Sequence, residues 1–314
     1  MRIAFVSHND LGLACLEELD ALGADVRAIY TRPREESVAD QTSFEGIATE
    51  TGADLQEIES VNTDAVVEQL RAYDPDLLYV VGWSRLVDER VIDVSNVATL
   101  GMHPAPLPRG RGRAPIAWTL IKGFEETALS MFHLVEAADA GDIVARQPID
   151  VAIEDDAASL YEKVVAAGRS LIRETYPQFE AGAVPRQPQD DERATWWPKR
   201  TPDQGGIDWR QSPKAVYDWI RGQTHPYPGA FSYLDGRNVT VWAADPPTGE
   251  RAFVRPGEIR GRSGDALTVG AWEGRIDLTR LQVEDGPELP AADLLDRDWV
   301  SVGDTFASLR GAEE

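Results

Sequence analysis

The chain has 314 residues, of which 42% are hydrophobic, and a formal net charge of −23 from 54 acidic and 31 basic residues. This length and hydrophobic content predict a folded protein of about two domains and exclude disorder for the bulk of the chain. The charge disfavours a large nucleic-acid interface, because such binding depends on Lys and Arg that neutralise phosphates.

The acidic residues are spread along the chain, and arginine far outnumbers lysine. We interpret this as a halophilic protein, since salt screens repulsion between surface carboxylates; a merely acidic surface is the alternative. The single cysteine, Cys15, excludes an internal disulfide and a zinc site built from several cysteines. The first apolar run is too short for a signal peptide, and no stretch approaches the roughly 20 apolar residues of a membrane span. We therefore expect a cytoplasmic protein.

The first half of the chain alternates between strand-like and helix-like segments. Short apolar runs predict four buried strands, at residues 2–6, 25–31, 75–83 and 97–103. Amphipathic segments predict helices at residues 11–24, 63–73 and 160–182. This alternation is typical of a doubly wound, mainly parallel, Rossmann-like α/β sheet, in which ligands bind at the carboxyl ends of the strands.

The second half of the chain has a different composition. Residues 183–206 are rich in proline and charge and predict a linker. Beyond them, short strand-like runs separated by turn residues predict a small, OB-like β-barrel or a sandwich. The sequence thus predicts three parts: an α/β domain at 1–182, a linker at 183–206 and a C-terminal β-barrel-like domain at 207–314.

Unusual stretches follow three of the predicted strands: "SHNDLG" (7–12), "GWSRLVDE" (82–89) and "GMHPAPLPRGRGRAPIAW" (101–118). In the first, His8 and Asp10 come just after the strand and Gly12 opens the next helix. A helix N-terminus that faces a pocket is a natural anion site. One glycine falls far short of a dinucleotide-binding fingerprint, so we do not predict a dinucleotide site.

The third stretch concentrates rigid backbone and positive charge. His103 follows a strand, where an imidazole suits proton transfer at neutral pH, although a turn histidine with a structural role is the alternative. The prolines, Pro106 among them, favour a rigid pocket wall over a ligand for a polyproline-binding groove. Arg109, Arg111 and Arg113 favour an anionic substrate over solvated surface charges, because guanidinium groups match phosphate oxygens.

Together the motifs resemble those of the 10-formyltetrahydrofolate-dependent formyltransferases. "GMHPAPLPRGRGRAPI" (101–116) and "EAADAGDIVARQ" (136–147) match the family pattern in order and spacing, and the resemblance extends to "KRTPDQGGIDW" (199–209). It implies catalytic roles for His103 and Asp139, where "ADAGD" by itself indicates only a turn. Gly101 stands at the position of the family's catalytic Asn. Loss of such a hydrogen-bond donor costs on the order of 10²–10³ in rate in an oxyanion hole.

The resemblance also implies the ligands. The cosubstrate 10-formyltetrahydrofolate would lie against Trp83, Arg85, Leu86, Val87, Asp139 and Gly141, and no metal is needed. "SHNDLG" and "RGRAPIAW" resemble the enzymes of the UDP-4-amino-4-deoxy-L-arabinose formyltransferase type. A nucleotide-linked amino sugar would then contact His8, Asp10, Gly12, Pro106, Arg111 and Arg113.

Three alternatives stay open on the sequence. They are a methionyl-tRNA formyltransferase, a non-catalytic protein that binds folate or a sugar nucleotide, and a hydrolase that releases formate. A homodimer is an expectation from the resemblance alone.

Overall fold

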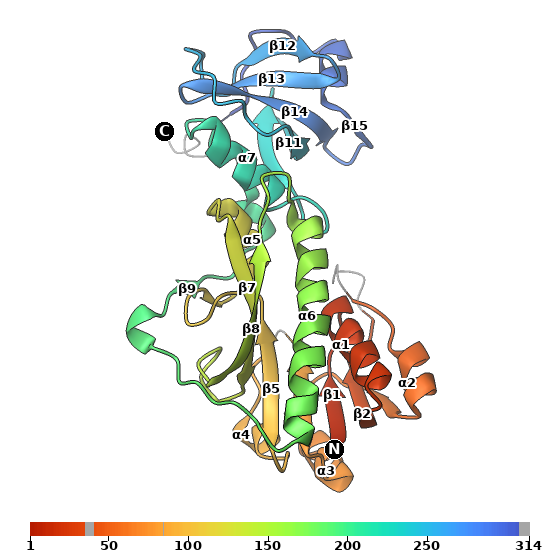
Figure 1. Cartoon of the computed structure of the whole chain (residues 1–314). Helices are drawn as coiled ribbons and strands as arrows, with labels where there is room; N and C mark the ends of the chain where they lie inside the picture. The colour runs from red at the N-terminus through yellow and green to blue at the C-terminus, as the bar shows by residue number, and fades with distance from the viewer. Residues whose placement is uncertain (35–40, 84, 308–314) are drawn as a thin grey trace. The chain divides into compact units, whose positions relative to one another are not determined.

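The computed structural model describes residues 1–34, 41–83 and 85–307, which form two compact units (Figure 1). Unit 1 comprises Met1–Pro115, Glu126–Asp150 and Tyr161–Pro198. Unit 2 comprises Ile116–Glu125, Val151–Leu160 and the described residues from Lys199 onward. Residues 183–198, which composition assigned to a linker, belong to unit 1. The domain boundaries at 182 and 206 stay a prediction.

Unit 1 is built on a seven-stranded sheet in the order β3-β2-β1-β4-β5-β7-β8. Its strands are β1 (Arg2–Val6), β2 (Asp25–Thr31), β3 (Asp54–Glu57), β4 (Leu77–Val81), β5 (Ala98–His103), β7 (Glu126–His133) and β8 (Ile143–Asp150). The first five pair in parallel, whereas β7 is antiparallel to β5 and β8 to β7. The predicted mainly parallel, doubly wound sheet is confirmed. Strands β2 and β3 lie on one side of β1, and β4 and β5 lie on the other. The strand order therefore reverses between β1 and β4, and sheets of this kind bind ligands at such a point.

Unit 1 contains the helices α1 (Asp10–Ala21), α2 (Glu45–Thr51), α3 (Asp64–Tyr73) and α4 (Glu89–Ile92). Helix α6 (Ala157–Glu180) begins in unit 2 and continues into unit 1. Helices α1 and α6 pack on one face of the sheet, beside β5 (Figure 1). There the Sγ atom of Cys15 lies 3.8 Å from the sulfur of Met102 in β5. Burial raises the pKa of the Cys15 thiol, so this cysteine is a packing residue.

The opposite face of the sheet carries the apolar cluster that supports the site. It combines Val6 of β1 and Val80 of β4 with Val66 and Val67 of α3. The partly buried residues that pack on the same cluster include Trp83, Val87 and Leu134. Leu134 follows β7, and the other two follow β4, so this cluster joins the loops that follow the two strands on either side of β5.

A short two-stranded element lies beside the Pro/Arg stretch. Strand β6 (Arg111–Gly112) pairs in parallel with β9 (Trp196–Trp197). Further back in the same segment, Gln187 and Ile143 exchange backbone hydrogen bonds at the start of β8. The residues before Pro198 are therefore held to unit 1 at two places.

Unit 2 is an antiparallel sheet in the order β10-β11-β14-β13-β12, with β15 paired to β14. Its strands are β10 (Ala230–Leu234), β11 (Arg237–Ala244), β12 (Ile259–Ser263), β13 (Ala266–Ala271), β14 (Gly274–Val283) and β15 (Glu288–Pro290). Residues Thr305 and Ala307 form bridges to Glu258, next to β12, and to Tyr233 of β10. One segment thus joins both ends of the sheet, as the predicted barrel requires.

The remaining helices are short. They are α5 (Pro115–Ile121), α7 (Pro213–Arg221) and the 3₁₀ turns at Asp191–Arg193, Pro202–Gly205 and Ala291–Asp296. Helix α7 begins with Pro213 behind the capping residue Ser212, whose hydroxyl accepts the backbone N–H of Ala215. Within the described residues, none of the helices combines the length and the apolar character needed to cross a bilayer.

Candidate active site

His103 is the last residue of β5 and is 7% exposed. Its Nε2 atom lies 2.8 Å from the carbonyl oxygen of Gly110, and its Nδ1 atom lies 3.7 Å from Oδ1 of Asp139. A carbonyl oxygen only accepts hydrogen bonds, so the first contact assigns a hydrogen to Nε2. Nδ1 is then the atom at which a proton can be taken up or released, directly beside a carboxylate.

Asp139 lies in the loop after β7, with a φ of +54°. Its Oδ2 accepts the backbone N–H of Gly112 at 2.8 Å, while Oδ1 faces His103. The carboxylate therefore connects the loop after β7 with the Pro/Arg stretch after β5. This geometry lets Asp139 orient the imidazole and compensate a positive charge on it.

Two glycines make this approach of loops possible. A Cβ on Gly141 would lie 1.7 Å from the carbonyl oxygen of His133. Gly112 has a φ of +107°, and a Cβ there would lie 2.4 Å from the carbonyl oxygen of Trp197. No real Cβ tolerates such distances, so both positions require glycine. The expected importance of Gly141 in this loop thus has a steric basis.

Gly101 lies two residues before His103 on the same face of β5. A Cβ at Gly101 would lie 2.8 Å from Cδ2 of Leu134 and 3.2 Å from Cζ of Phe132. Leu134 therefore covers the direction in which a side chain at position 101 would point. The surroundings of Gly101 on this face are apolar, and a donor for an oxygen bound there has to come from a different residue.

Trp83, which packs on the same apolar cluster as Leu134, carries a hydrogen-bond donor. Its indole Nε1 is buried and has no hydrogen-bond partner among the described residues. The ring packs on the cluster that holds Leu134 and makes an edge-on contact with the His8 ring, at 5.8 Å between centroids. Since an indole N–H can only donate, a buried one without an acceptor is available to a ligand oxygen.

The rest of the predicted folate segment is more exposed. Leu86 is 66% exposed, and its carbonyl oxygen accepts a hydrogen bond from Nδ2 of Asn62. The Arg85 guanidinium donates to the carbonyl oxygen of Glu59. Val87 turns inward onto the apolar cluster. The segment therefore presents Trp83 and Val87 to the sheet and Leu86 to solvent.

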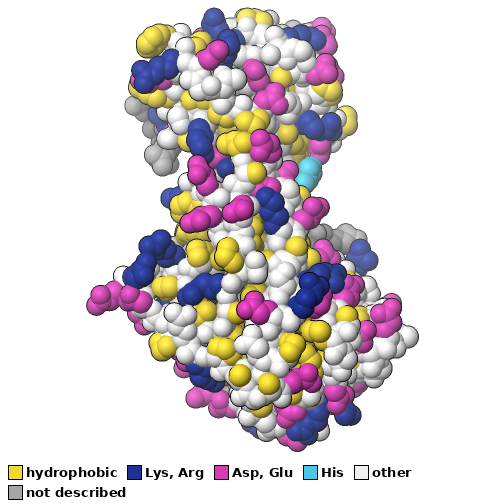
Figure 2. Space-filling model, viewed as in Figure 1, with side chains coloured by type: hydrophobic (Ala, Val, Ile, Leu, Met, Phe, Trp, Pro, Cys, Tyr) yellow, Lys and Arg dark blue, Asp and Glu magenta, His cyan; other side chains and the backbone are white. Residues whose placement is uncertain are grey.

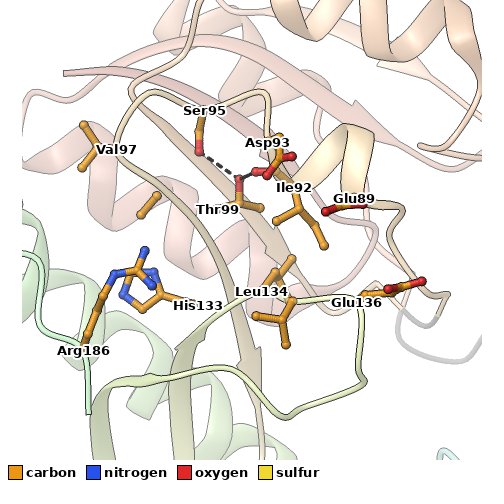
Figure 3. Close-up of a pocket in the computed structure, with 12 residues that line it drawn as sticks. Glu89, Ile92, Asp93, Ser95, Val97, Thr99, His133, Leu134, Glu136 and Arg186 are labelled. Carbon is orange, nitrogen blue, oxygen red and sulfur yellow. Dashed lines mark hydrogen bonds between the residues drawn. The ribbon is translucent and has the colours of Figure 1, made fainter. Parts of the chain in front are cut away.

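A pocket of about 540 Å³ lies on the same face, further toward the start of β5 (Figure 3). Leu134 points into its centre, between Glu89 and Glu136 on one side and His133 with Arg186 on the other (Figure 3). Burial lowers the pKa of His133, so its ring is neutral at neutral pH. The pocket thus combines an apolar floor with carboxylates at its edge.

The residues predicted to bind substrate after β1 lie at the carboxyl end of that strand, which neighbours β4 in the sheet. His8 is buried at 4% exposure, and Asp10 is the exposed first residue of α1. A Cβ on Gly12 would overlap the Ser7 side chain, so this glycine lets α1 start close to β1. Asn9, which the sequence analysis did not single out, caps α1 by accepting the backbone N–H of Gly12. An asparagine directly before a predicted helix is a typical capping residue, and this pattern could have identified Asn9 from the sequence.

The arginines of the Pro/Arg stretch have different environments. Arg109 and Arg113 are exposed, as is Pro106. Arg111 is 4% exposed, and its guanidinium donates to Oε1 of Gln189 and to Oδ1 of Asp191. A phosphate could reach Arg111 only by displacing these acceptors. The structure therefore gives Arg111 a role within the protein, whereas the side chains of Arg109 and Arg113 are exposed.

Gln189 is the second residue that sequence reasoning missed. Its amide nitrogen donates to the backbone carbonyl oxygens of Asp139 and Gly141. It lies in the Pro- and charge-rich stretch that composition assigned to a linker, where no periodicity marks a single glutamine. The described residues contain no group of three or more His, Cys, Asp or Glu side chains arranged to hold a metal ion.

The fold and this site define an α/β group-transfer enzyme with a histidine–carboxylate pair at the end of a central strand. The chain belongs to the formyl transferase family: the pattern described as "Formyl transferase" matches residues 1–175, and "Formyl transferase, C-terminal domain" matches residues 199–298. The resemblance inferred from the motifs is thereby confirmed, and the protein is a formyltransferase.

Several characterised proteins are similar to this chain. A methionyl-tRNA formyltransferase of Geobacter metallireducens is 30% identical over 299 residues, covering 94% of this chain and 95% of the relative. HypX from Aquifex aeolicus, solved with tetrahydrofolic acid, has a TM-score of 0.67 at 24% identity over 97% of this chain; the chain spans 50% of HypX. An N-formyltransferase of Helicobacter canadensis, solved with folinic acid and dTDP-3-aminofucose, has a TM-score of 0.66 at 14% identity, covering 88% of this chain and 98% of that one. At these identities the two solved structures show the fold alone.

Proposed function

We propose that this enzyme transfers the formyl group of 10-formyltetrahydrofolate to the amine of a nucleotide-linked amino sugar. The observation that carries the chemistry is the buried pair of His103 and Asp139 at the end of β5, with Nδ1 and Oδ1 3.7 Å apart. Formyl transfer needs a group that takes the proton of the attacking amine and donors that stabilise the negative charge on the formyl oxygen. The pair supplies the first requirement without a metal.

The residues of the pair divide this work. Nε2 of His103 stays bonded to the Gly110 carbonyl oxygen, which fixes the plane of the ring. Nδ1 accepts the amine proton, and Asp139 compensates the charge that the ring acquires. The ring then returns this proton to the N10 nitrogen of tetrahydrofolate as the bond between N10 and the formyl carbon breaks. Asp139 in turn is held by the Gly112 amide, so the acceptor of the proton is oriented before the reaction begins.

The residues around the pocket fit a reduced folate. Its pyrimidine ring presents N–H groups that can donate hydrogen bonds to the carboxylates of Glu89 and Glu136. The flat ring system of the folate can pack against the apolar side chain of Leu134. Trp83 and Val87 lie on the same apolar cluster as Leu134, which lines this pocket. When bound, the cosubstrate supplies an activated formyl carbon. Trp83 and the loop at Asp139–Gly141 would then face that carbon.

The donor role of Trp83 makes a specific prediction. In Trp83→Phe the ring remains and the N–H is lost, so kcat should fall by about 10²-fold while KM changes little. Trp272→Phe, an exposed tryptophan of unit 2, is the matched control and should retain full activity. Steady-state kinetics measures both. An unchanged kcat in Trp83→Phe would remove Trp83 from the mechanism.

The choice of acceptor is supported by charge. The net charge of −23 opposes a long polyanion, and acidic residues outnumber basic ones in residues 207–314. On the side drawn in Figure 2, Asp and Glu are interspersed with Lys and Arg, with no continuous basic surface among the described residues in view. A sugar nucleotide carries only two phosphates, which the exposed guanidinium of Arg113, just after β6, can contact. The same fold holds dTDP-3-aminofucose in the Helicobacter canadensis enzyme.

One observation favours a second acceptor. The Geobacter metallireducens relative, a methionyl-tRNA formyltransferase, matches this chain at 30% identity over nearly its whole length. Charged initiator tRNA is therefore the second candidate for the same chemistry.

A panel of acceptors separates the two candidates. The protein would be incubated with 10-formyltetrahydrofolate and either UDP- and dTDP-linked amino sugars or charged initiator methionyl-tRNA, at low and high salt. We expect a formyl mass gain on one sugar nucleotide, strongest at high salt, where the acidic chain is best screened. A mass gain on the tRNA alone would replace the sugar by the tRNA as acceptor. The His103→Ala protein serves as the blank.

A further inference from the structure

Gln189 uses all of its hydrogen-bonding capacity within the site. Its Nε2 donates to the carbonyl oxygens of Asp139 at 2.8 Å and of Gly141 at 2.7 Å. Its Oε1 accepts from Nε of Arg111 at 3.2 Å and from Nη2 at 2.8 Å. A primary amide has two donor hydrogens and two acceptor lone pairs, so no position is left over for solvent or substrate.

Arg111 determines which way the amide of Gln189 faces. A guanidinium group only donates, so it can contact only the oxygen of the amide, and the nitrogen must then face the two carbonyls. Arg111 is itself held by Asp191 at 2.7 Å and by the face of Trp196, 5.7 Å from its Cζ. An inverted amide would place donors against donors and leave both carbonyl oxygens without this partner.

The two carbonyls that Gln189 binds flank the bend that carries Asp139. Asp139 has a left-handed φ of +54°, a conformation that aspartate and asparagine adopt more readily than most residues but that contacts around the bend have to select. Gln189 ties the carbonyls on both sides of Ala140, so the bend cannot open at one end. The Asp139 side chain is thereby directed at the Gly112 amide and at His103.

We propose that Gln189 is a positioning residue for formyl transfer, which holds the Asp139–Gly141 bend so that the Asp139 carboxylate faces Nδ1 of His103. Gln189 contacts neither His103 nor the reacting atoms, and it acts through Asp139. The kinetic part of its test rests on the proposed formyl transfer, whereas the spectroscopic part does not.

Two substitutions test this role by different means. Gln189→Glu keeps the acceptor for Arg111 and replaces the two donated bonds by repulsion from the carbonyls, while Gln189→Met keeps the shape and removes every bond. We expect both to lower kcat by about 10-fold to 10²-fold, with KM unchanged within about threefold. Gln187→Glu makes the same change two residues earlier, at an exposed side chain, and should match the unmodified enzyme. Full activity in both Gln189 variants would overturn the proposal.

Coupling to Asp139 distinguishes positioning from a general structural effect. Asp139→Asn keeps a residue that tolerates left-handed backbone and removes the charge. If Gln189 acts through this carboxylate, Gln189→Met should lower kcat no further in the Asp139→Asn background. Additive losses in the double variant would show that Gln189 acts independently of Asp139 and would contradict the proposal.

A spectrum of the histidine rings tests the same point without any acceptor. The chain has 4 histidines, so long-range ¹H–¹⁵N spectra of the ring nitrogens can resolve each of them. The His103 ring signals of Gln189→Met should move toward those of Asp139→Asn, and Gln187→Glu should leave them in place. His103 signals that stay unmoved in Gln189→Met would overturn the proposal. This readout stands even if every acceptor fails, so it separates the positioning role from the proposed function.

Discussion

Replacing His103 with alanine should lower kcat for formyl transfer by about 10²–10⁴-fold, the range that a positioned acid–base group contributes. The substitution removes the only ring nitrogen placed beside Asp139 in the described site, and it leaves the Gly110 carbonyl oxygen without its donor. Binding of the cosubstrate should persist, because the pocket around Leu134 is untouched. Steady-state kinetics together with a binding titration of tetrahydrofolate measures the two effects separately.

The control for this variant is His225→Ala. His225 is the exposed histidine of unit 2 that stacks on Trp242, and it plays no part in the proposed chemistry. We expect it to retain the activity of the unmodified enzyme. Turnover by His103→Ala at the rate of His225→Ala would exclude His103 from catalysis.

Replacing Gly141 with alanine should disturb both stability and activity. Its Cβ would lie 1.7 Å from the carbonyl oxygen of His133, and because both groups are backbone, relief requires the loop to move. Overpacking of this kind destabilises a fold by about 1–3 kcal/mol. The same movement displaces Asp139, and a shift of about 1 Å in such a group can lower kcat about 10²-fold.

Thermal unfolding and kinetics of Gly141→Ala are best compared with Gly46→Ala. A Cβ on Gly46, in α2, meets no atom within 4 Å, and alanine favours a helix by up to about 1 kcal/mol. Gly46→Ala should therefore unfold at the same or a higher temperature and keep its activity. If Gly141→Ala behaved like Gly46→Ala, the close packing of the loop against His133 would be wrong.

Much of the fold could be predicted from local patterns. Strands such as residues 2–6 are continuous apolar runs, and the structure places β1 at Arg2–Val6. Strand β3 (Asp54–Glu57) could not be found in this way, because its residues are polar and it lies at the edge of the sheet. Strands β7 and β8 depend on antiparallel pairing across the Asp139 loop, which a pattern of single segments does not reveal.

The site was predictable where a residue type has a restricted chemistry. His103 and Asp139 are brought together as the family resemblance implied. Arg111 was not predictable, because a sequence cannot tell an arginine that meets a phosphate from one that is buried against Gln189 and Asp191. Gln189 acts through two backbone carbonyls 48 and 50 positions away. Such contacts depend on tertiary structure and leave no local pattern.

The glycine at position 101, where the family pattern has an asparagine, can be explained only from the tertiary structure. Leu134 and Phe132 fill the direction of the missing side chain, so reinstating an asparagine there would require Leu134 to move. The buried N–H of Trp83 lies on the same apolar cluster as Leu134. The absence of an asparagine donor at position 101 and the presence of the Trp83 donor therefore both belong to the packing around Leu134 on this face of the sheet.

The most direct test of the central claim follows the formyl group itself. 10-Formyltetrahydrofolate labelled with ¹³C in the formyl group would be supplied in a single turnover, at high salt, with the acceptor that the panel identifies. The fate of the label would be measured by mass spectrometry in the unmodified enzyme and in His103→Ala. We predict that the label appears on the acceptor amine in step with release of tetrahydrofolate, and that His103→Ala abolishes this transfer. Label recovered as free formate, whether or not an acceptor is present, would contradict formyl transfer and make the enzyme a hydrolase.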